Sequence, residues 1–205
     1  MANSSPVVIV DSGGANLASL QHALHRLGAV AIVSSDAKII ERAPRIILPG
    51  VGAAAMAMER LSRAGLIDVL RSCTQPLLGI CLGMQLLFEH SAEGDTPCLG
   101  LLPGHVHALT ASTERPVPHM GWNTLGDSEH ALVKDCAQQW FYFVHSYYVP
   151  GTSSSCIATT HYGLSIAAAV AVGNIMGVQC HPERSAHAGA RLLKNFLDMP
   201  NPQAT

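Results

Sequence analysis

One cysteine stands where the sequence favours a nucleophile. Cys81 is the middle residue of 79–83, Gly-Ile-Cys-Leu-Gly, where a short apolar stretch meets a helix predicted over 82–89. Glycines on both sides permit the sharp strand-to-helix turn that presents a nucleophile, because a Cβ there would clash with the strand and the helix. The positive end of the helix favours a thiolate. The competing interpretation is a small buried hydrophobic residue, which is the prediction for the other five cysteines.

A base and a partner for that base lie near the other end of the chain. The strand-like run 175–180 leads directly into His181, Pro182 and Glu183. A nucleophilic thiol needs a base to hold its proton, and the base needs a neighbour that fixes its tautomer. Because residues two apart in an extended chain project to the same side, His181 and Glu183 are predicted to be in contact. A single histidine is usually a satisfied surface or core imidazole, so the prediction depends on its pairing with the cysteine turn.

A glycine-containing loop is the third element. Residues 49–52, Pro-Gly-Val-Gly, follow a predicted strand, and glycines let the backbone approach a ligand closely. The N–H groups of Val51 or Gly52, together with that of Leu82, are predicted to form an oxyanion hole for a tetrahedral intermediate. A phosphate-binding loop is the alternative, but neither of the two common glycine-rich phosphate signatures is present.

The elements that must position these residues alternate between strands and helices. Strands are predicted over 7–10, 29–33, 45–48 and 76–80, and helices over 16–27, 53–62 and 65–72. This alternation is typical of βαβ units, so we predict an α/β fold with a mixed, mainly parallel sheet flanked by helices. Ligands bind at the carboxyl edge of such sheets, and Cys81 and His181 both follow predicted strands.

The second part of the chain has a different pattern. After residue 100 helix signals disappear, and short strands are predicted at 105–109, 117–124, 140–149, 156–161, 166–172 and 175–180 before a last helix at 187–198. We expect these strands to be partly antiparallel additions to the same sheet. No linker or repeat interrupts the pattern, so we predict a single domain, residues 1–199, followed by a C-terminal tail, residues 200–205.

The composition excludes several classes of partner and site. Hydrophobic residues make up 48% of the chain and the net charge is -2, which argues against disorder and against binding to nucleic acid or a membrane surface. The longest apolar run, 166–172, is far shorter than the roughly 20 residues of a membrane span. The six cysteines form no CxxC pair and residues 1–6 do not resemble a signal peptide, which predicts free thiols in the cytoplasm. His105 and His107 have no evident third ligand, so neither a metal site nor a cofactor is predicted.

The motifs together resemble those of class I (triad-type) glutamine amidotransferases. The class-wide motifs are the loop at 49–52, the turn at 79–85 and the triad segment at 181–183. A narrower resemblance, to the glutaminase subunits of imidazole glycerol phosphate synthases, rests on four further stretches: 11–17, 99–104, 118–123 (Pro-His-Met-Gly-Trp-Asn) and 143–148 (Phe-Val-His-Ser-Tyr-Tyr). The similarity spans essentially the whole chain and implies a flavodoxin-like fold. The chain departs from the usual pattern at Cys180, where phenylalanine is common, and at Arg184, where lysine is common, without losing a catalytic group.

The resemblance implies a mechanism that suits the residues already described. Cys81 attacks the side-chain amide of L-glutamine, His181 moves the proton to the departing ammonia, and Glu183 orients His181. A glutamyl thioester forms, and water then releases glutamate. The residues implied to hold the substrate are Gly50, Gly52, Gln85, Ser146 and Tyr147.

The resemblance also implies a protein partner. In the family, ammonia passes to a separate cyclase subunit of the (β/α)8 barrel type, which makes imidazole glycerol phosphate in histidine biosynthesis. This chain and the cyclase would form a heterodimer, with Asn16, Met120 and Trp122 at the interface. Buried core is the usual role of a tryptophan in a strand, and an interface anchor is the role that the resemblance favours for Trp122.

Three other functions remain as alternatives. The first is the glutaminase subunit of another class I amidotransferase. The second is a peptidase or deglycase of the related cysteine-turn type, which would keep Cys81 and His181 but has no need for the motifs at 49–52 and 118–123. The third is a regulatory binding subunit with an inactive triad, which would require a missing catalytic residue, and none is missing.

Overall fold

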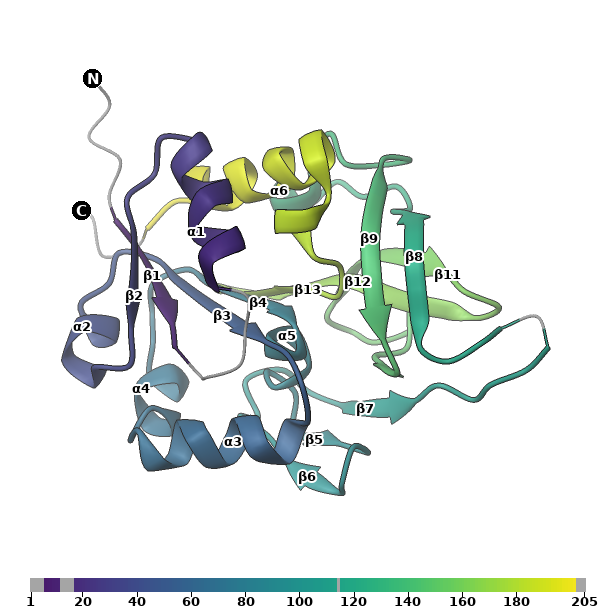
Figure 1. Ribbon diagram of the computed structural model, residues 1–205, viewed down its shortest axis with the longest axis horizontal. Helices are drawn as coiled ribbons and strands as arrows, with labels where there is room; N and C mark the ends of the chain where they lie inside the picture. Colours follow the sequence, from purple (N-terminus) through teal and green to yellow (C-terminus); the bar gives the residue numbers. More distant parts are fainter. Residues whose placement is uncertain (1–5, 12–16, 114, 202–205) are drawn as a thin grey trace.

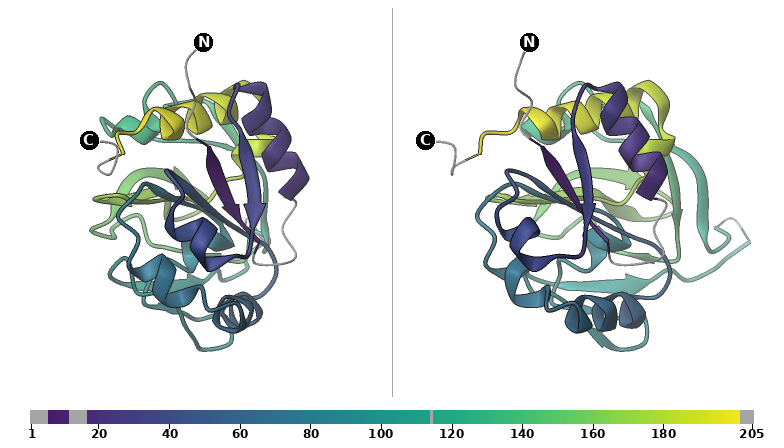
Figure 2. Two further views of the ribbon diagram at one scale, coloured as in Figure 1. Left: turned by 90° about the vertical axis from the view of Figure 1, so that its left-hand side faces the viewer. Right: turned by 60° about the vertical axis from the view of Figure 1, so that its left-hand side comes forward.

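The computed structural model describes residues 6–11, 17–113 and 115–201, and its elements form three sheets with helices packed on both faces of the largest (Figures 1 and 2). The strands are β1 (Val7–Val10), β2 (Ala31–Ser34), β3 (Ile46–Gly50), β4 (Leu77–Cys81), β5 (His90–Ser91), β6 (Thr96–Pro97), β7 (His105–Ala108), β8 (His119–Thr124), β9 (Trp140–His145), β10 (Tyr147–Tyr148), β11 (Cys156–His161), β12 (Ser165–Val172) and β13 (Ile175–Val178). The helices are α1 (Leu17–Arg26), α2 (Ala37–Glu41), α3 (Ala54–Arg63), α4 (Ile67–Arg71), α5 (Leu82–Gln85) and α6 (Ala186–Asp198), with 3-10 helices η1 (Ala131–Val133) and η2 (Pro182–Arg184).

The main sheet has seven strands in the order β11-β12-β13-β4-β3-β1-β2. The five strands from β13 to β2 are parallel, whereas β12 is antiparallel to β13 and β11 is antiparallel to β12. The prediction of an α/β fold with a mixed, mainly parallel sheet is therefore confirmed. Its consequence for the site is that β3, β4 and β13 end at the same carboxyl edge, which is where open α/β sheets bind ligands.

Two hydrophobic cores hold the helices on opposite faces of the sheet. Buried side chains of α1 and α6 pack on one face with the inner side of β9, and those of α2, α3, α4 and α5 pack on the other. Strands β1, β3 and β4 are buried along their whole length, as parallel strands covered by helices on both faces must be, whereas the edge strand β2 is only partly buried. Figure 1 places α1 and α6 side by side above the sheet and α3 and α4 below it. This burial fixes β3 and β4 rigidly beneath the site.

The expectation that every strand of the second half joins the main sheet is wrong for three of the six predicted strands, 105–109, 117–124 and 140–149, which form β7, β8, β9 and β10. β7 and β10 lie in a four-stranded sheet of order β10-β7-β5-β6, and β8 pairs with β9 in a two-stranded antiparallel ribbon. A strand is assigned to a sheet by its long-range partners, which local hydrophobic patterns do not specify. The ribbon stands at the side of the main sheet near the start of α6 (Figure 1).

None of the helices in the described part of the chain is long and apolar enough to span a membrane.

Candidate active site

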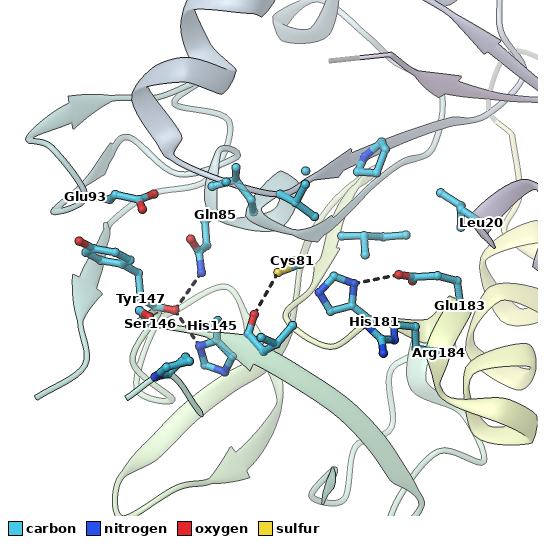
Figure 3. Close-up of a pocket in the computed structure, with 18 residues that line it drawn as sticks. Leu20, Cys81, Gln85, Glu93, His145, Ser146, Tyr147, His181, Glu183 and Arg184 are labelled. Atoms are coloured by element: carbon cyan, nitrogen blue, oxygen red, sulfur yellow. Dashed lines mark hydrogen bonds and ion pairs between the residues drawn. The ribbon is translucent and has the colours of Figure 1, made fainter. Parts of the chain in front are cut away.

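A cavity of about 420 Å³ lies at the carboxyl edge of the main sheet (Figure 3). Segments far apart in the sequence line it: the loop after β3, the turn between β4 and α5, the end of β9 with the residues that follow, and the segment after β13. Cys81, His181 and Glu183 all line this cavity, so the structure brings together the three side chains that sequence motifs singled out.

Cys81 occupies a strained turn between β4 and α5. Its backbone angles are φ 54° and ψ −112°, a combination that L residues rarely adopt. A Cβ on Gly79 would lie 2.7 Å from the backbone of Gly83, and one on Gly83 would overlap the carbonyl oxygen of Leu48. The two glycines are thus required by close approach, as the sequence predicted. The helix that follows is shorter than predicted, because α5 ends at Gln85 and not at residue 89.

His181 and Glu183 form a buried pair. The Nδ1 atom of His181 lies 2.8 Å from Oε1 of Glu183, and each side chain is only 9% exposed. Burial lowers the pKa of His181, but Cys81 and Glu183 outweigh that effect and raise it to about 10. The ring is therefore charged at neutral pH and donates its Nδ1–H to the carboxylate. A cation beside Cys81 favours negative charge on the sulfur.

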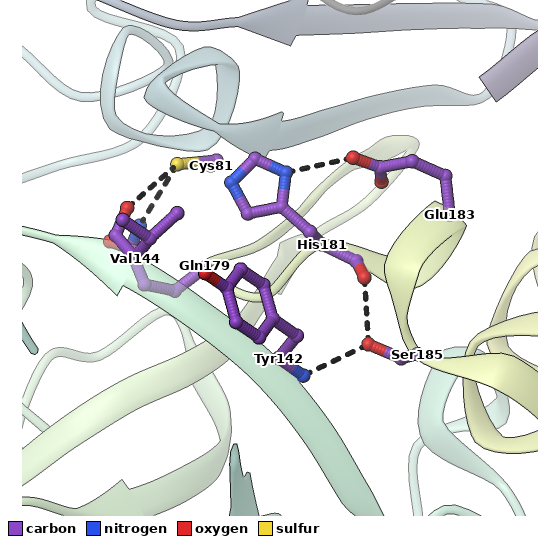
Figure 4. A network of polar contacts seen from close by, with 7 residues as sticks. All are labelled: Cys81, Tyr142, Val144, Gln179, His181, Glu183 and Ser185. Atoms are coloured by element: carbon purple, nitrogen blue, oxygen red, sulfur yellow. Dashed lines mark hydrogen bonds and ion pairs between the residues drawn. The ribbon is translucent and has the colours of Figure 1, made fainter. Parts of the chain in front are cut away.

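The second ring nitrogen of His181 faces the side on which Cys81 lies (Figure 4). This Nε2 atom is buried and has no hydrogen-bond partner among the described residues. The sulfur instead lies 3.8 Å from the carbonyl oxygen of Val144 and 3.8 Å from Nε2 of Gln179. The cysteine and the imidazole are therefore neighbours without a direct hydrogen bond between them.

The backbone after His181 departs from the predicted extended conformation, although His181 itself is extended. Glu183 belongs to the 3-10 helix η2, and His181 is the residue before that helix. The N–H of His181 donates to the Tyr142 carbonyl at 2.9 Å, and its own carbonyl accepts the hydroxyl of Ser185 at 2.7 Å. The hydroxyl of Ser185 also accepts the N–H of Tyr142 at 3.0 Å (Figure 4). These contacts tie His181 to β9, and sequence analysis did not identify Ser185.

A second thiol directly precedes the imidazole. Cys180 is fully buried. Burial, together with the nearby Glu183, raises the pKa of Cys180 well above its usual value. Its thiol therefore stays protonated and out of contact with solvent, and Cys81 remains the cysteine of the cavity.

The glycine loop after β3 lies directly beside the cysteine turn. Gly50 is the register partner of Cys81 between the parallel strands β3 and β4, and a Cβ on Gly50 would lie 2.9 Å from the backbone nitrogen of Gly83. Val51 and Gly52 follow as lining residues of the cavity, and Gly52 has φ +88°. Leu82, the first residue of α5, has an N–H with no partner inside the helix. The two segments whose N–H groups were predicted to form an oxyanion hole are therefore adjacent, and both line the cavity.

Polar groups line the side of the cavity that lies across Cys81 from His181 and Glu183 (Figure 3). Gln85, Ser146 and Tyr147 line it as predicted (Figure 3). Nε2 of Gln85 donates to the Tyr147 carbonyl at 2.8 Å and to Oε1 of Gln179 at 2.9 Å. Glu93 also lines this side, and its Oε2 accepts the N–H of Ala54 at 2.8 Å. Glu93 was missed because it lies in the connection between the short strands β5 and β6, for which the sequence carries no recognisable signal.

Two of the three predicted interface residues can be placed. Met120 and Trp122 are 61% and 52% exposed on β8, whereas Asn16 lies outside the described residues. On the inner face of the same strand, Nδ1 of the buried His119 lies 3.0 Å from Nε2 of His145. Burial lowers the pKa of His119 to about 4, and burial together with His119 lowers that of His145 to about 3. Sequence analysis did not identify this neutral pair.

Comparisons with known proteins agree with the arrangement of the site. The chain matches the family described as Glutamine amidotransferase class-I over residues 8–199. A curated relative from Xylella fastidiosa (strain Temecula1), named Imidazole glycerol phosphate synthase subunit HisH, is 53% identical over 197 residues, which are 94% of this chain and 97% of the relative. A relative of the same name from Xanthomonas euvesicatoria pv. vesicatoria is 52% identical over 198 residues, or 96% of this chain and 98% of the relative.

Solved structures with much lower sequence identity share the fold. One described as a glutamine amidotransferase superposes with a TM-score of 0.73 at 20% identity, covering 93% of this chain and 96% of that chain. A structure of PurLQS from Thermotoga maritima gives a TM-score of 0.68 at 18% identity, covering 94% of this chain and 98% of that chain. At these identities the likeness concerns the fold alone.

Proposed function

The chain belongs to the class-I glutamine amidotransferase family, and we propose that it is the glutaminase subunit of an imidazole glycerol phosphate synthase. The observation that carries the proposal is the cavity in which Cys81, on a strained turn, meets the buried pair of His181 and Glu183. The name shared by relatives more than 50% identical over nearly the whole chain supports the choice of synthase.

In the proposed reaction the sulfur of Cys81 attacks the side-chain carbonyl carbon of L-glutamine. The oxygen of the tetrahedral intermediate is stabilised by backbone N–H groups of Leu82 and of Val51 or Gly52. His181 gives its Nε2 proton to the departing nitrogen, which leaves as ammonia, and a glutamyl thioester remains. Water, deprotonated by the now neutral His181, then attacks the thioester and releases glutamate and the thiolate. Glu183 holds the ring by its Nδ1–H throughout.

The amino-acid end of glutamine is proposed to bind on the side of the cavity formed by Gln85, Glu93 and Tyr147. The carboxylate of Glu93 is suited to the substrate α-ammonium group, because opposite charges attract strongly at a partly buried site. Gln85 has given both amide hydrogens to protein acceptors, so its Oε1 can only accept a hydrogen bond from the ligand. Gly50, Gly52, Ser146 and Tyr147 complete the wall that holds the substrate.

Ammonia is proposed to pass to a cyclase subunit of the (β/α)8 barrel type, bound as a heterodimer on the outer face of the β8–β9 ribbon. Met120 and Trp122 are exposed on that face, as is Trp140 on β9, which is 60% exposed. In the antiparallel register Met120 lies opposite Val144, which also lines the active-site cavity. A partner seated on these side chains would therefore adjoin the rim of the cavity, where ammonia is released. All six cysteines are free thiols, which supports a reducing cytoplasm as the location.

The proposal is tested by measuring glutamate release by the purified chain with and without the matching cyclase and its ligand. Cys81→Ala should lower turnover at least about 10³-fold while leaving the complex intact in size-exclusion chromatography. Trp122→Ala should weaken the complex, because it removes an exposed aromatic anchor, and should leave the Cys81 thiol unchanged. Undiminished turnover by Cys81→Ala would contradict the mechanism. If the synthase subunit of another amidotransferase stimulated glutamate release and the cyclase did not, the chain would be assigned to that other amidotransferase.

A further inference from the structure

The sulfur of Cys81 has a side-chain neighbour that the reaction described above does not use. Gln179 follows β13 and is completely buried, and its Nε2 lies 3.8 Å from Sγ of Cys81 (Figure 4). Its other amide atom, Oε1, accepts a hydrogen bond from Gln85 at 2.9 Å. The polar atoms of a fully buried side-chain amide normally have hydrogen-bond partners, so the contact between Gln179 and the sulfur calls for an explanation.

The orientation of the Gln179 amide is dictated by a chain of contacts that starts at a backbone carbonyl. The oxygen of Tyr147 can only accept hydrogen bonds, so the side chain of Gln85 must present its NH₂ group to it. The second hydrogen of that NH₂ group goes to Gln179, which must therefore turn its Oε1 toward Gln85. The NH₂ group of Gln179 is left facing the sulfur.

The same carbonyl is held in place from its other side. Nδ1 of His145 lies 2.8 Å from the Tyr147 oxygen and must donate to it, so in the neutral ring Nε2 is an acceptor. His119 then donates from Nδ1 to that acceptor. His145 and Gln85 thus both donate to the Tyr147 carbonyl, and the remaining hydrogen of Gln85 fixes the amide of Gln179 with its NH₂ group toward Cys81.

The two contacts of the sulfur favour different ionisation states. The carbonyl oxygen of Val144, 3.8 Å away, can only accept the S–H of a neutral thiol. The amide N–H of Gln179 can donate to the sulfur, and this contact strengthens when the sulfur becomes an anion. We propose that Gln179 is a positioning residue for the nucleophile: its amide, oriented by Gln85 and the Tyr147 carbonyl, holds an N–H donor on the sulfur of Cys81 and stabilises the thiolate. This inference rests on the proposed function only in taking Cys81 as the nucleophile.

The test is the rate at which iodoacetamide alkylates Cys81 in the full-length chain, followed by mass spectrometry of the peptide that contains it. Two variants of Gln179 are compared with the wild type between pH 5 and pH 9. Gln179→Glu keeps the acceptor for Gln85 and places a carboxylate oxygen against the sulfur. Gln179→Met keeps the length of the side chain and removes donor and acceptor together.

A matched control is available in a second buried glutamine. Gln75 is 1% exposed, and its Nε2 donates to the carbonyls of Ile40 and Glu41 at 3.2 Å each, remote from the cavity. Gln75→Glu introduces a comparable buried carboxylate without touching Cys81. This control distinguishes a general effect of a buried carboxylate on the fold from the specific loss of the Gln179 N–H donor at Cys81.

At pH 7 the alkylation rate should fall about tenfold in Gln179→Glu and about threefold in Gln179→Met, and the pH profile should move to higher pH in both. Gln75→Glu should alkylate Cys81 like the wild type. With the cyclase present, the Gln179 variants should lose kcat with little change in KM. Folded variants that alkylate with the wild-type rate and pH profile would overturn the proposal.

A measurement on the wild type decides the matter if neither variant folds. The side-chain amide protons of Gln179 should change their NMR chemical shift as Cys81 ionises, and an unchanged signal would overturn the proposal. Because alkylation needs neither glutamine nor a partner, the two proposals fail separately. A chain that hydrolyses no glutamine but responds to Gln179 in alkylation would reject the proposed function and retain this inference.

Discussion

Two histidine sites near β9 differ in charge at nearly equal burial: His181 is protonated, whereas His145 and His119 are neutral. His181 is 7% exposed, His145 is 6% exposed and His119 is 3% exposed. The pKa of His181 is raised to about 10, because Cys81 and Glu183 outweigh the effect of burial. The pKa values of His145 and His119 are lowered to about 3 and about 4, since burial dominates where the neighbours are another imidazole and a carbonyl. The charge of a buried imidazole is therefore set by its partners. His181 keeps a proton at neutral pH, whereas the neutral His119 and His145 fix the position of the Tyr147 carbonyl beside the cavity.

The largest expected effect is on catalysis at the charged site. His181→Gln should lower the turnover of glutamine by about 10²–10⁴-fold, because it removes the group that protonates the leaving nitrogen. His145→Asn keeps a donor in the place of Nδ1 and should lower turnover less than about tenfold. The measurement is glutamate release by the complex at saturating glutamine. Equal losses in the two variants would remove the functional distinction between the sites.

The next effect concerns the carboxylate that makes the two sites different. Glu183→Gln preserves an acceptor for Nδ1 but removes the negative charge, so the pKa of His181 should fall. Turnover at pH 8 should drop roughly tenfold or more, because less of the imidazole is protonated for ammonia release. The measurement is the pH dependence of kcat. If kcat falls at the same alkaline pH in the variant as in the wild type, Glu183 only orients the ring.

The neutral pair should make the fold sensitive to acid. Unfolded histidines bind protons as the pH falls below about 6.5, whereas folded His119 and His145 stay neutral until about 4 and about 3, so stability declines between these values. We expect each histidine to lower the free energy of unfolding by about 2 kcal/mol between pH 7 and pH 5, so the pair together by roughly 3–4 kcal/mol. Urea denaturation at both pH values measures it, and His145→Asn should flatten the decline.

The charged site has the opposite dependence. The folded pKa of His181 lies above its unfolded value, so its contribution to stability is fully present below about pH 6.5 and is lost as the pH rises through about 10. Urea denaturation at pH 8 and pH 10 should therefore show a decline that is smaller in Glu183→Gln. A variant that loses as much stability as the wild type over this range would contradict the assignment of charge.

The smallest effect belongs to a cation next to the charged site. The guanidinium carbon of Arg184 lies 4.5 Å from the ring centre of Tyr142, which places the charge over the ring face. Arg184→Met keeps most of the side-chain stem and should cost about 0.5–1 kcal/mol of stability. A double-mutant cycle with Tyr142→Leu isolates the pair, and a coupling energy near zero would mean that the contact contributes nothing.

The parts of the molecule that could be predicted from the sequence are those encoded locally. The alternation of buried strands and helices up to residue 81 predicted β1, β3 and β4 closely, and the motifs at 79–83 and 181–183 led to the cysteine and the imidazole–carboxylate contact. Glycine spacing and the order of strand, turn and helix are properties of a few consecutive residues. They require no knowledge of the rest of the fold.

The parts that could not be predicted depend on distant pairing. The ribbon of β8 and β9 was taken for part of the main sheet, and the contact between Gln85 and Gln179 joins residues that only the fold brings together. Ser185 directly precedes α6, a position typical of a helix N-cap. Its hydroxyl instead accepts the N–H of Tyr142 on β9 and donates to the carbonyl of His181. Tertiary contacts compete with local signals in such cases, and the sequence alone does not say which will prevail.

The most direct test of the account is an NMR titration of the imidazole nitrogens of His181 and His145 in the wild type and in Cys81→Ala. The account predicts that wild-type His181 stays protonated through pH 8, that Cys81→Ala lowers its pKa by about one unit or more, and that His145 stays neutral down to pH 5 in both proteins. If His181 titrated near pH 6.5 in both the wild type and Cys81→Ala, the claim that the two side chains act as one unit would be contradicted.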